Sequence, residues 1–290
     1  MKDYQIKTFL TYASGKNANT CADKIAINKE KLRFAVADGV SASYMPSVWA
    51  EILSETFTNE DTTPELFNKL LEEGLLDSLS ARWREQTEEI EQQAEGKLAM
   101  RYERAKELYE NAASTLAGIS IYDNAVHYFV VGDSCIFLIN DSTLTVLSEI
   151  NSVNSFTNRP DYIASDNHID GTPIVGSENI PDGWIVLMTD AVAKWFWKKQ
   201  EQEPEFVIEL WNISTQEEFE SLIQKERDDE TMDNDDVAIV MIKIENEEND
   251  IEIAQKALEE PDCQSIVEKP TVILSRLCIF RLVKRLFGKN

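Results

Sequence analysis

Four aspartates stand beside apolar segments of the kind that form buried strands. Asp38 and Asp190 follow LRFAVA and GWIVLMT, Asp133 lies in VVGDSCIF, and Asp233 stands shortly before VAIVMI. At a strand end a carboxylate leaves the core, and several that meet at one rim of a sheet repel one another unless a cation lies between them. Oxygen ligands suit Mg²⁺ or Mn²⁺, and two such ions can hold a hydroxide for in-line attack on phosphorus.

Each aspartate also has a simpler explanation. Asp38 followed by glycine is a common turn after a strand, and so is the Gly-Asp-Ser segment around Asp133. Asp233 belongs to the acidic run DNDD, which is also what a solvated loop looks like. The four residues therefore indicate a metal site only as an ordered set, in the context of the elements around them.

The composition limits the classes of function. A chain of 290 residues is long enough for one large domain or two small ones. The formal net charge of −25 argues against a nucleic-acid partner, which needs a basic surface, and is compatible with bound divalent cations. The four cysteines lack CxxC spacing and predict neither a disulfide framework nor a zinc site. The sequence shows neither a signal-peptide core nor an apolar run that could span a bilayer, so we expect a reducing cytoplasm.

The elements that position the aspartates follow from the hydrophobic pattern. Helical spacing of apolar residues predicts helices, and short apolar runs bounded by turn residues predict strands. Strands are predicted over 24–37 (two, around a polar turn), 114–148 (three), 182–190 and 233–244. Helices are predicted over 46–58, 63–79, 191–202 and 215–230, and the charged segment 81–113 predicts one long exposed helix or a helical pair.

The order of these motifs resembles that of the metal-dependent protein phosphatases of type 2C, as in a divergent bacterial-like member. The segments CADKIAI, FAVADGVSAS, ASTLAG, VVGDSCIF, IVLMTDAVAKW and DNDDVAIVMI follow the family's order, over roughly residues 8–244. The resemblance implies a protein serine/threonine phosphatase that hydrolyses phosphoserine or phosphothreonine with a metal-activated water. It also implies two or three Mn²⁺ or Mg²⁺ ions, a phosphoprotein substrate and a cognate serine/threonine kinase.

The resemblance also implies a role for each metal ligand. Asp38 bridges two ions, and Gly39 offers its backbone carbonyl to the first of them. Asp190 and Asp233 complete the second ion's ligands, and Asp133 shares a weaker third ion with Asp190. All five positions match the family's motifs in this sequence.

The register of the last motif selects one aspartate among three. The family's aspartate lies four residues before the first apolar residue of the strand, here Val237, and this spacing selects Asp233. Asp235 and Asp236 are then expected to lie in the turn or behind the ligands. Asp236 stands where the family usually has threonine.

Asp23 matches the early aspartate of the family, and the resemblance implies that it orients a water and is catalytic together with Asp38. Near it the chain departs from the family's pattern. Lys16 is the sole cation in SGKNANTCAD, where the family often has an arginine that grips the substrate phosphate, and Ala22 replaces an acidic residue. We expect Lys16 to substitute in part for this arginine at the substrate phosphate, because lysine binds phosphate as a point charge, without the planar fork of arginine. These departures leave open a rival interpretation, a catalytically weak or inactive phosphatase-like module that binds or regulates.

The fold implied by the resemblance is α+β, a four-layer α-β-β-α sandwich of two mainly antiparallel sheets flanked by helices, over residues 1–244. An acidic linker over 245–264 and a basic amphipathic segment over 265–290 are predicted to follow. On a helix, the basic and apolar residues of this segment separate onto two sides, although imperfectly. We expect the segment to dock on the domain or a partner, or to lie on an anionic membrane, which would hold the protein peripherally at the inner membrane face.

Overall fold

The computed structural model describes residues 2–17, 20–59, 62–140, 143–157 and 159–246. Residues 4–244 form one compact unit, and the other unit comprises residues 1–3 and 245–290. The predicted basic segment over 265–290, and all but the first two residues of the predicted linker, lie outside the described residues. In the described part of the chain, no helix combines the length and the apolar character that a membrane crossing needs.

Two five-stranded sheets carry the site. The first has the order β1-β12-β11-β7-β8 and the second the order β10-β6-β5-β3-β2. The strands of the first sheet are β1 (Lys2–Thr11), β12 (Val237–Asn246), β11 (Gly183–Met188), β7 (Cys135–Asn140) and β8 (Leu144–Leu147). Those of the second are β10 (Ile174–Asn179), β6 (Ala125–Val131), β5 (Leu116–Tyr122), β3 (Arg33–Ala37) and β2 (Lys24–Asn28). A short pair, β4 (Ala113–Ser114) and β9 (Ile163–Ala164), lies outside both sheets.

The sheets face each other across an apolar core. Strand β11 pairs antiparallel with both β12 and β7, and β5 pairs antiparallel with both β3 and β6. Alternate residues of each strand enter the shared core, such as Val36 and Ile119 from one sheet and Ile185 and Val240 from the other. Because helices cover the outer faces too, the central strands are buried on both sides, which explains their unbroken apolar sequences.

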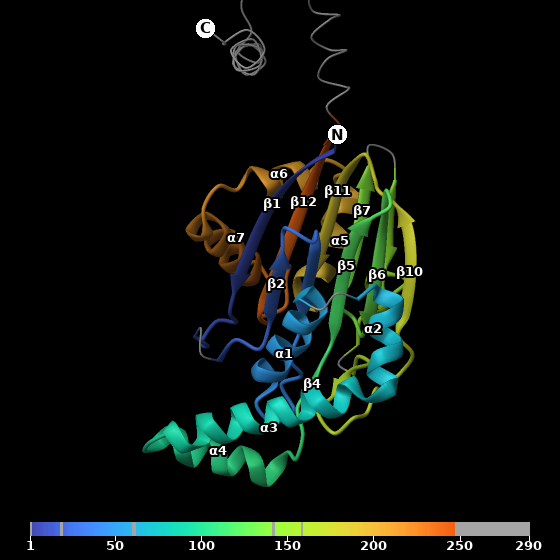
Figure 1. Cartoon of the computed structure of the whole chain (residues 1–290). Helices are drawn as coiled ribbons and strands as arrows, with labels where there is room; N and C mark the ends of the chain where they lie inside the picture. The colour runs from blue at the N-terminus through green and yellow to red at the C-terminus, as the bar shows by residue number, and fades with distance from the viewer. Residues whose placement is uncertain (1, 18–19, 60–61, 141–142, 158, 247–290) are drawn as a thin grey trace, which may run out of the picture. The chain divides into compact units, whose positions relative to one another are not determined.

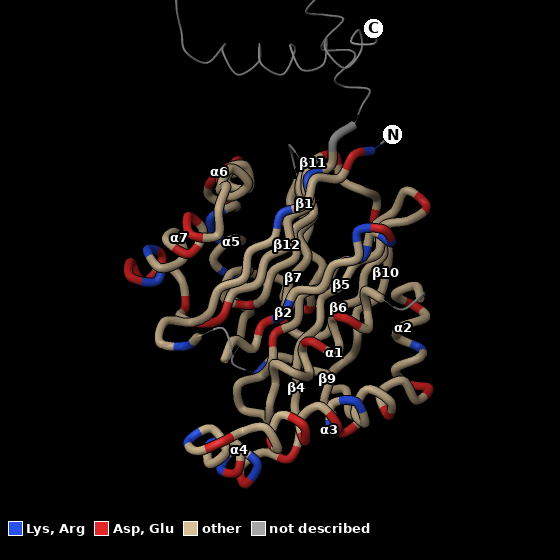
Figure 2. The backbone as a smooth tube through the Cα atoms, turned by 60° about the vertical axis from the view of Figure 1, so that its left-hand side comes forward, with Lys and Arg blue, Asp and Glu red and all other residues tan. Residues whose placement is uncertain are grey.

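Helices form the two outer layers. They are α1 (Pro46–Asn59), α2 (Pro64–Leu70), the π-helical turn η2 (Leu71–Leu75), α3 (Leu76–Gln93), α4 (Lys97–Leu108), the 3₁₀ turn η3 (Val153–Ser155), α5 (Asp190–Gln202), α6 (Phe206–Asn212) and α7 (Gln216–Asp228). Apolar residues of α1, α2 and α3 pack on the second sheet, and those of α5, α6 and α7 pack on the first. In Figures 1 and 2, α1 and α2 accordingly lie on one side of the sheets and α6 and α7 on the other. The predicted four-layer sandwich is confirmed.

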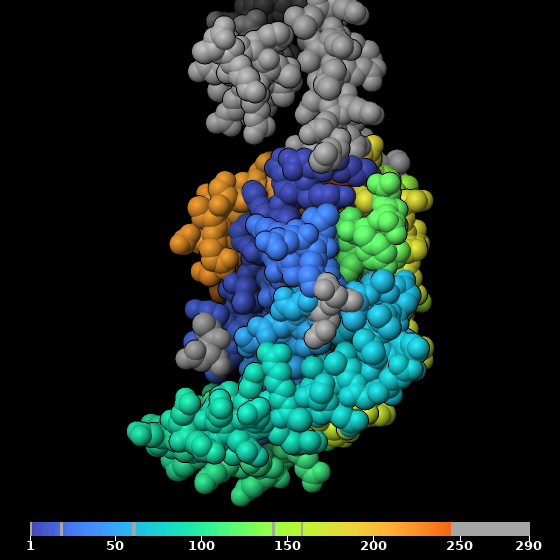
Figure 3. All heavy atoms as spheres, in the orientation of Figure 1, coloured from blue at the N-terminus to red at the C-terminus, as the bar shows by residue number. Residues whose placement is uncertain are grey.

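The helix boundaries refine the sequence-based expectations. The predicted helix over 63–79 begins as expected, because Thr63 caps α2 by accepting a hydrogen bond from the backbone N–H of Leu66. It is interrupted at Gly74, whose φ of 114° lies in the left-handed region, and α3 then runs on to Gln93. The segment 81–113 forms a helical pair, since the chain turns at Ala94–Gly96 before α4. In Figure 3 this teal pair extends beyond the rest of the described unit at the lower edge of the view.

Candidate metal-binding site

Three of the predicted ligands meet at one end of the sandwich. Carboxylate oxygens of Asp38, Asp133 and Asp190 all lie within 4.8 Å of one another. Asp38 follows β3 of the second sheet, whereas Asp133 precedes β7 and Asp190 follows β11 of the first. The two sheets therefore deliver their carboxylates to a common point, although the residues are far apart in the sequence.

The backbone around Asp38 is held by the segment that precedes β5. The N–H of Asp38 donates to the hydroxyl of Thr115 at 3.1 Å, and the carbonyl of Asp38 accepts from Thr115 N at 2.9 Å and from Ser114 Oγ at 2.8 Å. Gly39 forms a β-bridge with Ser114 and has no room for a side chain, since a Cβ atom there would lie 2.8 Å from Cβ of Pro46. The strand end and the start of α1 thus fix the place of Asp38.

Asp133 owes its place to a tight turn. Gly132 has a φ of 89°, and a Cβ atom there would lie 2.5 Å from the backbone oxygen of Asp161, so only glycine fits. The side chain of Asp133 is 3% exposed, and its Oδ1 has no hydrogen-bond partner among the described residues. This turn also separates β6 from β7, so the segment 114–148 holds the four strands β5 to β8 in addition to the short β4, and the expected number of three is corrected.

Asp23 lies buried beside the three ligands. It is 2% exposed, and its Oδ2 has no hydrogen-bond partner among the described residues. Burial raises the pKa of Asp23 well above its usual range, and the negative charge of Asp38 raises it further. The two carboxyl groups share a hydrogen bond, which raises the pKa of Asp23 and lowers that of Asp38.

The carboxyl groups of the metal-free cluster have pKa values raised toward neutral pH. Burial, with the nearby charge of Asp133, raises the pKa of Asp38 to about 7. Burial, with the charge of Asp190, raises the pKa of Asp133 to about 7. Burial, with the charge of Asp38, raises the pKa of Asp190 to about 8. A hard divalent cation fits this group, because it would satisfy the unpartnered oxygens and neutralise the repulsion.

Asp233 lies outside this cluster. Its side chain is 66% exposed, and its Oδ2 accepts a hydrogen bond at 2.7 Å from Nζ of Lys194, one helical turn after Asp190 in α5. Its negative charge nevertheless contributes to the raised pKa of Asp190, so the two carboxylates are neighbours. Its role as a metal ligand stays a prediction.

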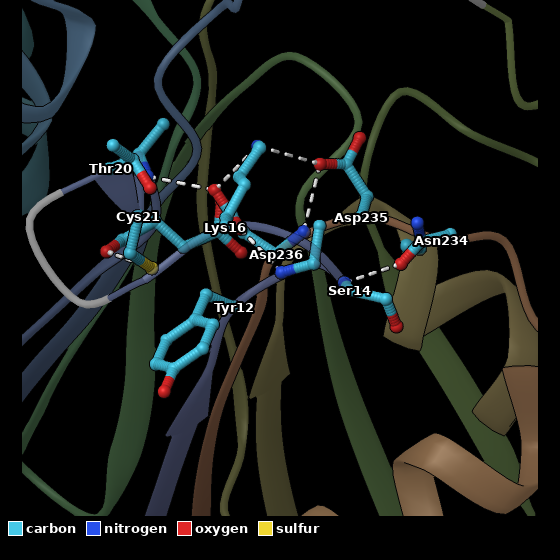
Figure 4. A network of polar contacts seen from close by, with 12 residues as sticks. Tyr12, Ser14, Lys16, Thr20, Cys21, Asn234, Asp235 and Asp236 are labelled. Atoms are coloured by element: carbon cyan, nitrogen blue, oxygen red, sulfur yellow. Dashed lines mark hydrogen bonds and ion pairs between the residues drawn. The ribbon is translucent and has the colours of Figure 1, made fainter.

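Lys16 faces the segment before β12. Its Nζ lies 3.0 Å from Oδ2 of Asp236 and 3.6 Å from Oδ1 of Asp235 (Figure 4). Burial acts to lower the pKa of Lys16, but the hydrogen bond and charge of Asp236 outweigh it, and the pKa is raised. The ammonium thus already has carboxylate partners.

Asp236 is the residue whose importance the sequence reasoning missed. Its carboxylate is 2% exposed and accepts from the backbone N–H groups of Ala13 and Ala22, each at 2.8 Å, as well as from Lys16. It therefore anchors the loop that leads into Asp23. The sequence did carry a signal, since the family usually has threonine at this position. A carboxylate has two acceptor oxygens and can accept more hydrogen bonds than a hydroxyl group.

Comparisons with known proteins agree with this arrangement. The family model of protein phosphatase 2C matches residues 14–226. A search of curated proteins finds no match.

Solved structures of bacterial phosphatases share the fold. A bacterial serine phosphatase is 13% identical with a TM-score of 0.55, covering 84% of this chain and 99% of its own. The serine/threonine phosphatase Stp1 from Staphylococcus aureus is 15% identical with a TM-score of 0.51, covering 84% and 96%. The catalytic domain of the serine/threonine protein phosphatase PstP, in complex with two manganese ions, is 16% identical with a TM-score of 0.53, covering 85% and 100%. At these identities the likeness establishes the fold.

Proposed function

Because the chain belongs to the protein phosphatase 2C family, we propose that it is a metal-dependent protein serine/threonine phosphatase. The observation that carries the proposal is the group of Asp38, Asp133 and Asp190, whose oxygens lie within 4.8 Å of one another. Asp133 is buried and the other two are half-buried. Carboxylates at this separation repel one another without a counter-charge, so their convergence needs a functional reason.

The donor set suits Mn²⁺ or Mg²⁺, in two or three sites. Asp38, Asp133 and Asp190 would hold the ions, with Asp233 and the carbonyl of Gly39 as further proposed ligands. Ions bound there would lower the pKa of a water and neutralise phosphate oxygens. The two manganese ions of the PstP complex support this choice of metal.

The carboxyl group of Asp23 would orient a water and carry a proton. Its Oδ2 has no hydrogen-bond partner among the described residues and would orient a water, and the carboxyl group shares a hydrogen bond with Asp38. The raised pKa of Asp23 means that this carboxyl group holds a proton more readily than an exposed aspartate does, which suits a group that takes up and releases a proton. Asp23 and Asp38 would thus act together, as proposed from the sequence.

The role of Lys16 in binding the substrate phosphate stays a prediction. Its ammonium is engaged by Asp236, which favours a part in holding the loop. A phosphoprotein substrate, a cognate serine/threonine kinase and a cytoplasmic location are further parts of the proposal. Docking of the segment 265–290 on a membrane or a partner also stays a prediction, because the segment lies outside the described residues.

A second candidate is a module of the same fold that binds or regulates with little turnover. The ion pairs of Lys194 with Asp233 and of Lys16 with Asp236 favour it, because they engage groups that the active enzyme would use. Hydrolysis of a small aryl phosphate distinguishes the two. We expect turnover with Mn²⁺ that is lost on adding a chelator, whereas binding of a phosphopeptide without turnover would support the module.

A further inference from the structure

Lys194 places a positive charge beside the carboxylates. It lies in the second turn of α5, four residues after Asp190, so both side chains emerge from one side of the helix. The intervening residues Ala191, Val192 and Ala193 are buried in the core, which fixes the rotation of the helix. The rigid packing of α5 therefore sets where the lysine side chain begins.

The partner of Lys194 comes from another element. Asp233 precedes β12, and β12 pairs with β11, the strand that leads into α5. The backbone N–H of Thr189 donates to the carbonyl of Ala238 at 3.2 Å, which ties the two segments together at this end of the sheet. The elements that carry Lys194 and Asp233, whose Nζ and Oδ2 atoms lie 2.7 Å apart, are thus held next to each other by backbone hydrogen bonds.

We propose that Lys194 is an internal cation that competes with a divalent ion for Asp233. This inference rests on the proposed function and concerns the order in which the divalent ions bind to the metal centre. An ion at Asp38, Asp133 and Asp190 meets no lysine partner, because none of these carboxylates is ion-paired among the described residues. An ion that uses Asp233 must displace the ammonium and then bind close to it.

The exposure of the pair determines the size of the effect. The Lys194 and Asp233 side chains are 44% and 66% exposed, so water screens their attraction and the ammonium can swing away without unfolding. The packing of α5 fixes the base of the side chain beside Asp190, so the lysine charge stays in the neighbourhood of the incoming ion. Such repulsion, screened by water, predicts that the second ion binds with an affinity about tenfold lower than it would without the lysine. The first ion is expected to bind tightly and the second only at higher metal concentration.

Titration of the full chain with MnCl₂, followed by calorimetry and by the electron paramagnetic resonance of free Mn²⁺, tests this inference. Lys194→Gln should bind the second Mn²⁺ about tenfold more tightly and leave the first unchanged. Lys194→Arg should behave like the wild type, because it keeps the charge. Lys198→Gln, an exposed lysine one turn further along α5, is the matched control and should also leave both affinities unchanged.

Two results would overturn the inference, and they differ in what they say about the proposed function. If Lys194→Gln and the wild type bind the second ion with equal affinity, Lys194 does not compete with that ion. This result would leave the proposed metal centre unaffected. If the wild type and all the variants fail to bind Mn²⁺, the result would contradict both the proposed metal centre and the inference about Lys194.

Discussion

Replacing Asp38 by asparagine should stabilise the protein in the absence of metal. Burial and the charge of Asp133 raise the pKa of Asp38 from 3.8 to about 7. Each unit corresponds to 1.36 kcal/mol, so the ionised carboxylate costs about 4 kcal/mol at pH 8. Since Asp38 shares a hydrogen bond with Asp23, part of this cost is a property of the pair and is not removed by changing Asp38 alone. We therefore expect the free energy of unfolding to rise by about 2 kcal/mol. For a domain of this size the gain corresponds to a Tm increase of about 4–8 °C.

The sign of the pH dependence follows from the raised pKa. Between about pH 4 and pH 7 the folded protein keeps a proton on Asp38 that the unfolded chain releases, so the stability of the metal-free wild type falls as the pH rises from about 4 to about 7 and then levels off. The variant lacks this titration. Its advantage should therefore be largest at pH 8, clearly smaller at pH 5 and absent only below about pH 4.

The assay is thermal unfolding in EDTA at both pH values, followed by circular dichroism. Asp229→Asn, at an exposed position after α7, is the control and should show no such difference. Adding Mn²⁺ should reverse the order, because the ion stabilises the wild type by binding its folded state. An Asp38→Asn protein that is less stable than the wild type at pH 8 in EDTA would refute the reasoning.

Two further variants test the loop that leads into Asp23. Asp236→Ala removes the acceptor of two buried backbone N–H groups and of an ammonium, so we expect a loss of about 3 kcal/mol and a Tm lower by about 6–12 °C, measured in EDTA. An unchanged Tm would mean that water replaces the carboxylate. Lys16→Ala should lower the Tm by about 2 °C, since it removes the partner of Asp236. An unchanged KM for a phosphopeptide would limit Lys16 to holding the loop. A rise in KM larger than the fall in kcat would instead assign Lys16 to the substrate phosphate.

The strands and most helices could be predicted because burial leaves a strong local pattern. Strand β11 is buried on both faces, and its sequence is apolar throughout. The interruption at Gly74 was harder to predict, because a glycine within a helical pattern is compatible with either a continuous or a broken helix. The number of strands between Ser114 and Ser148 was underestimated because the Gly-Asp-Ser turn has only one glycine to mark it.

The site was predictable only in part. Asp38, Asp133 and Asp190 follow from strand ends and from the family's motif order, and the structure brings them together. The ion pair of Lys194 with Asp233 joins residues 39 positions apart, which no local pattern encodes. The contacts of Asp236 with Ala13 and Ala22 join residues 223 and 214 positions apart. Such contacts depend on how the two ends of the domain meet in the first sheet.

Release of phosphate from a phosphothreonine peptide by the full chain tests the central claim most directly. With Mn²⁺ the wild type should turn over the peptide, and EDTA should abolish this turnover. Asp38→Asn and Asp190→Asn should be inactive at every Mn²⁺ concentration while keeping the circular dichroism spectrum of the wild type. Phosphate release that persists in EDTA, or that these two variants retain, would contradict the claim that the three clustered aspartates form a catalytic metal centre.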